Sequence, residues 1–422
     1  MDIKALYEIF RKSSGVNTDS RTVRENQLFV ALKGENFDGN AFAMKALEAG
    51  ALCAVVSESL EAEDPRLVKV PDTLATLQEL AAYHRRQLDI PVIGLTGTNG
   101  KTTTKELIKA VLSAKYTVSA TEGNLNNDIG VPLTVLKINE EADIAIVEMG
   151  ASHPEDLRPL LAVAQPTHGL ITNVGKAHLL GFGSFEGVKH AKGLLYDYLK
   201  EHDGIAFANA DDDTLQEMLW ERELPRIPYG MEGVELLPSS AEHPFLRLRF
   251  QDAVLETHLV GAYNSPNILA ALKLGCFFGV PTEDARRAVS SYVPSNNRSQ
   301  LLKTERNTVI VDAYNANPSS MAVALDNLSR SEGRKVALLG DMRELGEDSA
   351  AEHEKIVKTK LQGIEAYLVG EEFTKAAAGS GIPCFATSDL LSAYLKEHPL
   401  QGATVLVKGS RGTRMEKVID AL

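Results

Sequence analysis

The stretch Val92-Ile93-Gly94-Leu95-Thr96-Gly97-Thr98-Asn99-Gly100-Lys101-Thr102-Thr103-Thr104 joins an apolar run to a glycine turn and then to a helix-like segment. Glycines let backbone N–H groups approach phosphate oxygens, and a helix N-terminus adds positive potential. Lys101 is long enough to reach β- and γ-phosphates, and the hydroxyl of Thr102 or Thr103 can meet Mg²⁺. The sequence therefore predicts a nucleotide site formed by Gly97, Thr98, Asn99, Gly100, Lys101, Thr102 and Thr103.

The spacing of this loop is shorter than that of the general phosphate loop, G-x-x-x-x-G-K-[ST]. Counting back from Gly100, the position of the first glycine holds Leu95, and the glycine present is Gly97. This short form indicates a subtype of phosphate loop. The alternative, an ordinary glycine turn that caps a helix, does not account for a lysine followed by three threonines.

Apolar runs on both sides of the loop indicate an α/β chain with a mainly parallel central sheet. Runs that are continuously apolar, and therefore fit strands buried on both faces, alternate with helix-like segments. They lie at 92–96, 144–147, 169–172 and 205–208, with a helix expected at 101–113. Residues 246–250 alternate between apolar and basic side chains with a period of two, which predicts an antiparallel strand late in this region.

Two further regions flank the central one. After it, strands expected at 309–311, 336–339, 366–369, 383–386 and 405–407 predict a Rossmann-like sheet. Before it, strands at 28–32 and 51–56 and a helix at 42–49 predict a small α/β unit. Asp89-Ile90-Pro91 should end a helix near 80–87, and Pro294-Ser295-Asn296-Asn297 should form a hinge. We therefore expect three domains, at 1–87, 88–294 and 295–422.

Composition restricts the class of protein. A chain of 422 residues exceeds one ordinary core, and a formal net charge of −13 argues against a nucleic-acid binder. The three cysteines have no metal-binding or disulfide spacing, the N-terminus lacks a signal-peptide pattern, and no apolar run reaches the ~18 residues of a membrane helix. We expect a monomeric, cytoplasmic protein without membrane insertion.

Three motifs beyond the loop match one known family. They are Gly123-Asn124-Leu125-Asn126-Asn127-Asp128, Val147-Glu148-Met149-Gly150 and Thr172-Asn173-Val174-Gly175-Lys176-Ala177-His178. Together with the short phosphate loop, they resemble the Mur ligases, the amide-bond ligases of peptidoglycan precursor synthesis. The likeness spans nearly the whole chain, and the combination of motifs is specific although each one alone is weak.

The resemblance implies ATP-dependent ligation of a carboxylate to an amine through an acyl phosphate. It assigns catalysis to Lys101, Glu148, His178 and Lys192, and the binding of two Mg²⁺ ions to Thr102, Glu148, His178 and Lys192. Lys192 would act as a carbamate, although Leu194 stands where the family usually has glutamate. Without the resemblance, Glu148 could be a capping or salt-bridged residue, His178 a buried histidine and Lys192 a solvated helix lysine.

Motifs in the last region narrow the resemblance to the branch that adds a dipeptide. Asp312-Ala313-Tyr314-Asn315-Ala316-Asn317-Pro318, Gly340-Asp341-Met342-Arg343-Glu344-Leu345-Gly346 and Lys408-Gly409-Ser410-Arg411-Gly412 are typical of that branch. The implied substrates are UDP-N-acetylmuramoyl-tripeptide and D-Ala-D-Ala. The third residue of the tripeptide stays open between lysine, diaminopimelate and others.

The resemblance also assigns binding roles along the chain. Further ATP contacts are expected from Asn264, Asn267, Arg298, Asp312, Tyr314 and Asn317. The UDP-sugar is assigned to Asp19, Ser20, Arg21, Asp38, Gly39 and Asn40 of the first domain, the substrate channel to Asn126 and Asn127, and the dipeptide carboxylate to Lys408, Ser410 and Arg411. Asn40 and Tyr263 each replace a histidine that the family usually has.

Two alternatives remain on the sequence alone. One is another enzyme of the same type, such as the diaminopimelate-adding Mur ligase or a folylpolyglutamate synthetase. The other is a regulatory ATPase with a phosphate loop, which would release phosphate without a carboxylate or an amine. Because the assigned groups come from three domains, we expect the site to be complete only when the third domain closes on the second. In a structure without ligands, Lys101 and Arg298 could therefore lie far apart.

Overall fold

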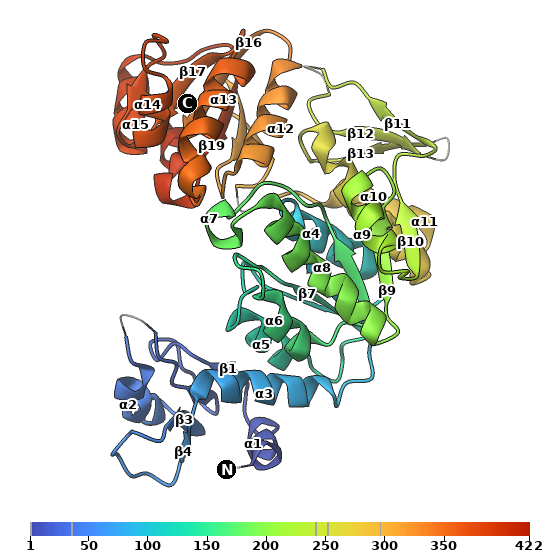
Figure 1. Ribbon diagram of the computed structural model, residues 1–422, viewed down its shortest axis with the longest axis vertical. Coiled ribbons are helices and arrows are strands. Elements are labelled where there is room, and N and C mark those ends of the chain that lie inside the picture. Colours follow the sequence, from blue (N-terminus) through green and yellow to red (C-terminus); the bar gives the residue numbers. More distant parts are fainter. Residues whose placement is uncertain (1, 35–36, 241–242, 251–252, 296) are drawn as a thin grey trace.

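The computed structural model describes residues 2–34, 37–240, 243–250, 253–295 and 297–422. Three sheet-centred units follow one another along the long axis of the molecule, with the N-terminus in the first unit and the C-terminus in the third (Figure 1). Asn296 of the expected hinge lies outside the described residues, as do Glu35 and Asn36 in the first unit.

The first unit is a parallel sheet of four strands in the order β1-β2-β3-β4. Its elements are α1 (Ile3–Phe10), β1 (Val16–Asn17), β2 (Leu28–Val30), η1 (Gly39–Phe42), α2 (Ala43–Glu48), β3 (Cys53–Ser57), β4 (Leu67–Val70) and α3 (Thr73–Arg85). Helix α3 begins well before the expected 80–87 because the carboxylate of Asp72 accepts a hydrogen bond from the backbone N–H of Ala75. This helix packs against α5 and α6 of the central unit.

The central unit is a parallel sheet in the order β10-β9-β8-β5-β7-β6. Its strands are β5 (Val92–Thr96), β6 (Val118–Ala120), β7 (Ile144–Glu148), β8 (His168–Ile171), β9 (Ile205–Asn209) and β10 (Arg226–Tyr229). Its helices are α4 (Lys101–Leu112), α5 (Gly130–Leu136), α6 (Leu157–Ala164), α7 (Leu179–Phe182), α8 (Phe185–Glu201), α9 (Asp213–Trp220), η2 (Ala262–Asn264), α10 (Ser265–Phe277) and α11 (Thr282–Ser291).

Both faces of the central sheet are covered, as the continuous apolar runs predicted. Alternate strand residues enter separate cores: Ile146 packs with residues of α4 and α10, whereas Val147 packs with residues of α5, α6 and α8. The expected antiparallel piece is a separate sheet of three strands, β11 (Val234–Leu237), β12 (Arg247–Phe250) and β13 (Ala253–Glu256). Only its middle strand was expected from the sequence.

The third unit has six strands in the order β14-β15-β19-β16-β17-β18. They are β14 (Gln300–Lys303), β15 (Thr308–Asp312), β16 (Arg334–Gly340), β17 (Glu365–Val369), β18 (Cys384–Phe385) and β19 (Ala403–Lys408). The helices are α12 (Pro318–Ser329), η3 (Gly346–Asp348), α13 (Ser349–Lys360), α14 (Glu371–Ala376), α15 (Ser388–Glu397), η4 (Arg411–Thr413) and η5 (Met415–Ala421). Strand β14 is an antiparallel edge, and the other strands are parallel.

The α/β fold class with three sheet-based units is therefore confirmed. Within the described residues, no helix has the length and apolar character that crossing a membrane requires.

Candidate active site

The phosphate loop connects β5 to α4, as predicted. Gly97 and Gly100 have φ angles of 141° and 79°, backbone conformations that residues with a side chain rarely adopt. A Cβ atom on Gly97 would also lie 2.0 Å from Oγ1 of Thr172. The backbone N–H groups of Thr98 and Asn99 donate to Asn173, so the loop is fixed against the segment that follows β8.

Lys101 lies folded over its own loop. Its Nζ donates to the carbonyl oxygens of Gly97 at 2.7 Å and Thr98 at 3.2 Å. Burial lowers the pKa of Lys101, while the charge of Glu148 opposes this effect. A phosphate oxygen offers this ammonium a stronger acceptor than a carbonyl does, because the acceptor is charged.

Glu148 ends β7 beside the loop, and its side chain is 1% exposed. Its Oε1 accepts hydrogen bonds from Asn126 at 2.8 Å and from the Thr102 hydroxyl at 3.3 Å. Its Oε2 is buried without a hydrogen-bond partner among the described residues, although Nζ of Lys105 lies 4.0 Å away. A carboxylate oxygen and a threonine hydroxyl in contact are ligands that Mg²⁺ takes beside a bound phosphate.

The described residues contain no cluster of three or more His, Cys, Asp or Glu side chains that could hold a metal. Mg²⁺ keeps several waters and takes few protein ligands beside substrate phosphates. Glu148 with Thr102 therefore fits the metal that the sequence resemblance implies. His178 does not contact Glu148 in the hydrogen-bond pattern; its Nδ1 lies 2.5 Å from Oε2 of Glu344 in the third unit.

Lys192 is buried on α8, and its exposed fraction is 2%. Its Nζ donates to the carbonyl oxygen of Ala151 at 3.4 Å and lies 5.4 Å from the ring centre of Phe182. Burial, together with the charge of Lys101, holds the pKa of Lys192 well below its ordinary value. Lys192 does not itself line the main cavity, but the neighbouring Ala151 does.

Residues of the central and third units line one cavity of about 1050 Å³. Most of the residues assigned to ATP and the metal line it: Thr98, Asn99, Gly100, Lys101, Thr102, Thr103, Glu148, His178, Asn264, Asn267, Arg298, Asp312, Tyr314 and Asn317. The guanidinium of Arg298 stacks on Tyr314 at 3.7 Å, and Nδ2 of Asn317 donates to Oδ1 of Asn99 at 2.8 Å. Lys101 and Arg298 therefore face one cavity, in a closed arrangement.

Three family models match the chain in succession. They are "Mur ligase family, catalytic domain" at residues 12–85, "Mur ligase middle domain" at 95–275, and "Mur ligase, glutamate ligase domain" at 297–411. The chain belongs to the Mur ligase family.

Two curated relatives of this Mur ligase carry the same name. The UDP-N-acetylmuramoyl-tripeptide–D-alanyl-D-alanine ligase of Bacillus subtilis is 35% identical, with 97% of this chain and 93% of that protein covered. The ligase of the same name from Escherichia coli is 36% identical, with 96% and 93% covered.

Solved structures agree with this grouping. A MurF crystal structure from Acinetobacter baumannii has a TM-score of 0.87 and 30% identity, with 99% of this chain and 97% of that chain covered. The MurF ligase of Thermotoga maritima in complex with ADP has a TM-score of 0.84 and 28% identity, with 98% and 97% covered. A diaminopimelate ligase and a folylpolyglutamate synthase, at 19% and 16% identity, share only the fold.

The residues assigned to the UDP-sugar lie in the first unit of this Mur ligase, outside the main cavity. Asp19 forms an ion pair with Arg21, and the carboxylate of Asp38 accepts hydrogen bonds from the backbone and side chain of Asn40. Oδ1 of Asn40 also accepts from the backbone N–H of Ser57 at 2.8 Å, so asparagine has a structural use at this position. The roles of Asp19, Ser20, Arg21, Asp38, Gly39 and Asn40 stay predictions.

The substrate residues divide between several places. Asn126 and Asn127 line the main cavity, as does Lys408, whose Nζ donates to Oδ2 of Asp312 at 2.5 Å. Ser410 and Arg411 do not line it. Oγ of Ser410 accepts from the backbone N–H of Arg343, and the guanidinium of Arg411 lies 5.3 Å from the Tyr314 ring.

Sequence reasoning assigned no role to two residues at the site. Lys105 is completely buried, and its Nζ donates to the carbonyl oxygen of Thr121 at 2.6 Å and lies 2.9 Å from Oε1 of Glu106. A lysine on an amphipathic helix gives no signal of such burial. Glu344 was quoted within a motif, but its contact with His178 depends on how two units pack, which the local sequence does not encode.

Proposed function

We propose that this chain ligates D-alanyl-D-alanine to UDP-N-acetylmuramoyl-tripeptide at the expense of ATP, in peptidoglycan precursor synthesis. The observation that carries this function is similarity over nearly the full length, at 35% and 36% identity, to curated ligases of that name. The cavity agrees with it, because a phosphate loop from one unit faces Arg298 and Asp312 from another.

The chemistry follows from the substrates. A free carboxylate does not form an amide with an amine in water, so its oxygen first takes the γ-phosphoryl group of ATP, giving an acyl phosphate and ADP. The dipeptide amine then attacks the acyl carbon, the C–N bond forms, the amine loses a proton, and inorganic phosphate leaves. No enzyme nucleophile is needed, so catalysis rests on positioning and on neutralising phosphate charge.

The residues of this chain supply those two contributions. Lys101 from the central unit and Arg298 from the third unit place positive charge at the phosphates, and the stacking of Arg298 on Tyr314 fixes the plane of its guanidinium. Closure of the third unit also keeps water from the acyl phosphate, which water would otherwise hydrolyse. Asn317 supports this closure through its hydrogen bond to Asn99.

Two Mg²⁺ ions are proposed at this site, held by Thr102, Glu148, His178 and Lys192 after its carbamylation. When bound, Mg²⁺ neutralises charge on the transferring phosphoryl group. The unpartnered Oε2 of Glu148 supports the first site. The lowered pKa of Lys192 supports the carbamate, because CO₂ reacts with a neutral amine and not with an ammonium.

The segment that contains Lys408, Ser410 and Arg411 is proposed to hold the dipeptide. Lys408 lines the main cavity, and Gly412 and Thr413 line a second cavity of about 780 Å³ at the carboxyl ends of the third sheet. The segment therefore runs from one cavity to the other.

Arg411→Ala tests this assignment. Because a charged hydrogen bond to the dipeptide carboxylate would be lost, the KM for D-Ala-D-Ala should rise about tenfold while the KM for ATP stays within about twofold. Steady-state kinetics with each substrate varied in turn measures both constants. A rise in the KM for ATP alone would instead assign Arg411 to the nucleotide.

The function itself is tested by phosphate release from the purified chain. Release should require ATP, UDP-N-acetylmuramoyl-tripeptide, D-Ala-D-Ala and Mg²⁺ together, and omission of any one should reduce the rate to background. Parallel assays with lysine and diaminopimelate as the third residue identify the accepted tripeptide. Phosphate release without tripeptide or dipeptide would instead favour a regulatory ATPase, and ligation unaffected by chelation of Mg²⁺ would contradict the metal site.

A further inference from the structure

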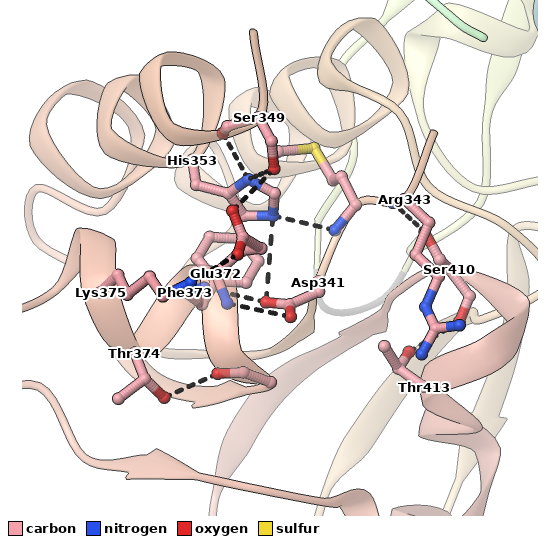
Figure 2. Close-up of polar contacts among 12 residues, drawn as sticks. Asp341, Arg343, Ser349, His353, Glu372, Phe373, Thr374, Lys375, Ser410 and Thr413 are labelled. Atoms are coloured by element: carbon pink, nitrogen blue, oxygen red, sulfur yellow. Dashed lines mark hydrogen bonds and ion pairs between the residues drawn. The ribbon is translucent and has the colours of Figure 1, made fainter. Parts of the chain in front are cut away.

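The loop at residues 341–346 follows β16 and is a motif without a role in the mechanism above. Its base is tied to neighbouring elements, as Figure 2 shows. The carboxylate of Asp341 accepts hydrogen bonds from the backbone N–H groups of Glu372 at 3.1 Å and Phe373 at 2.9 Å. The backbone N–H of Asp341 donates to the carbonyl of Val369 at 2.9 Å. The loop therefore begins from a fixed point on the third sheet.

A buried histidine holds the next residue of the loop. Nδ1 of His353 donates to the carbonyl oxygen of Ser349 at 2.7 Å, which leaves Nε2 as an acceptor for the backbone N–H of Met342 at 3.0 Å. On the other side, the backbone N–H of Arg343 donates to Oγ of Ser410 at 2.8 Å (Figure 2). The two residues immediately before Glu344 are thus hydrogen-bonded to two different elements.

Glu344 is at the tip of this loop and reaches the central unit. Its φ of 66° is left-handed, a conformation that costs free energy in a residue with a side chain. Its Oε2 lies 2.5 Å from Nδ1 of His178, and its carbonyl oxygen accepts from the backbone N–H of Leu180 at 3.3 Å. The Leu180 side chain covers Gly346, since a Cβ atom there would lie 3.2 Å from Cδ1 of Leu180.

A second ion pair joins the same two units. Nζ of Lys176 lies 2.8 Å from Oε1 of Glu352 on α13, and Oγ of Ser319 accepts from the backbone N–H of Lys176 at 3.2 Å. The segment that carries His178 is therefore held by the third unit on both sides of Ala177, and α7 lies at the boundary of the two units (Figure 1).

We propose that Glu344 is a positioning residue that holds the imidazole of His178 through Nδ1, so that His178 takes its working orientation only when the third unit is docked. With Nδ1 engaged, Nε2 is the ring nitrogen that serves the cavity lined by His178. A carboxylate on the second nitrogen commonly fixes the tautomer and plane of a functional histidine. This inference rests on the proposed function, because His178 acts only in that reaction.

The consequence is that domain closure and site assembly are one event. In the docked arrangement, Asn317 contacts the phosphate loop while Glu344 contacts His178. A third unit that swings away withdraws both contacts together. An undocked enzyme would thus hold ATP without a complete site, which protects ATP from hydrolysis before the tripeptide and the dipeptide are bound.

Kinetics of a double-mutant cycle tests this coupling. Glu344→Ala should lower kcat by about 10- to 100-fold, and Glu344→Gln should retain more activity because an amide oxygen can still accept from Nδ1–H. If Glu344 acts through His178, the double variant His178→Ala/Glu344→Ala should be no slower than His178→Ala alone. The exposed Glu347 of the same turn provides the matched control, and Glu347→Ala should keep the wild-type rate.

A second measurement needs neither nucleotide nor metal. In the NMR spectrum of ¹⁵N-histidine-labelled protein, the Nδ1 signal of His178 is identified as the one that disappears in His178→Ala. This signal should shift in Glu344→Ala and stay in place in Glu347→Ala. The proposal would be overturned by an unshifted Nδ1 signal in folded Glu344→Ala. It would also be overturned if the loss of kcat in the double variant equalled the product of the losses in the two single variants. If the wild-type protein did not ligate but the signal still shifted, the proposed function would fail and the contact would stand.

Discussion

Replacing Lys101 with alanine should lower the ligation rate at least about 1000-fold and leave the protein folded. The side chain lines the cavity at the first turn of α4, and among the described residues its Nζ donates to the carbonyl oxygens of Gly97 and Thr98 in its own loop. Its removal takes away the positive charge that offsets the γ-phosphate during transfer. Few packing contacts are lost, because Val111 and Leu112 of the same helix make the contacts with the core.

The measurement combines ligation rates with thermal unfolding of the same samples. Lys109→Ala is the matched control, since Lys109 is an exposed lysine near the other end of α4. It should keep both the rate and the midpoint of unfolding. Full activity of Lys101→Ala would remove the phosphate-loop assignment, and loss of activity together with unfolding would make Lys101 a structural residue instead.

The sequence predicted the phosphate loop and the strands around it well because their signals are local. Strand β5 was expected at 92–96 and lies at Val92–Thr96, where a short, continuously apolar run that ends at a glycine turn favours a buried strand. Strands β14 and β18 are short and lie at the two edges of the third sheet. Their form depends on pairing with neighbours, which is why β14 was missed and β18 is shorter than expected.

The candidate site divides in the same way. Residues in contiguous motifs, such as Thr102 and Glu148, come together because Thr102 lies just beyond β5 and Glu148 ends the neighbouring parallel strand β7. The contact of Glu344 with His178 could not be predicted, because it depends on how two units dock. The ion pair of Asp312 and Lys408 lies within the third unit and depends on β15 and β19 being neighbours in its sheet. This ion pair places a cation beside the carboxylate that the resemblance assigned to ATP.

Lys192→Ala should lower the ligation rate about 100-fold, and short carboxylates such as formate or acetate should restore part of it. The reason is the environment of the amine. Lys192 is buried beside Ala151 and Phe182, its pKa is held well below the ordinary value, and a neutral amine can add CO₂ to become a carboxylate-like group. The truncated side chain would leave space in which an added carboxylate can take the place of the carbamate.

Lys189→Ala separates this role from a general effect on α8. Lys189 lies on the same helix but forms an ion pair with Glu217, so its loss should change the rate less than about twofold. Carbon-13 NMR of protein equilibrated with ¹³C-bicarbonate provides the direct observation, as a carbamate signal present in wild type and Lys189→Ala but absent in Lys192→Ala. If Lys192→Ala were fully active, the carbamate would be excluded. If the variant were inactive, no carboxylate rescued it, and the wild-type protein showed no carbamate signal, Lys192 would instead be a buried amine that stabilises α8.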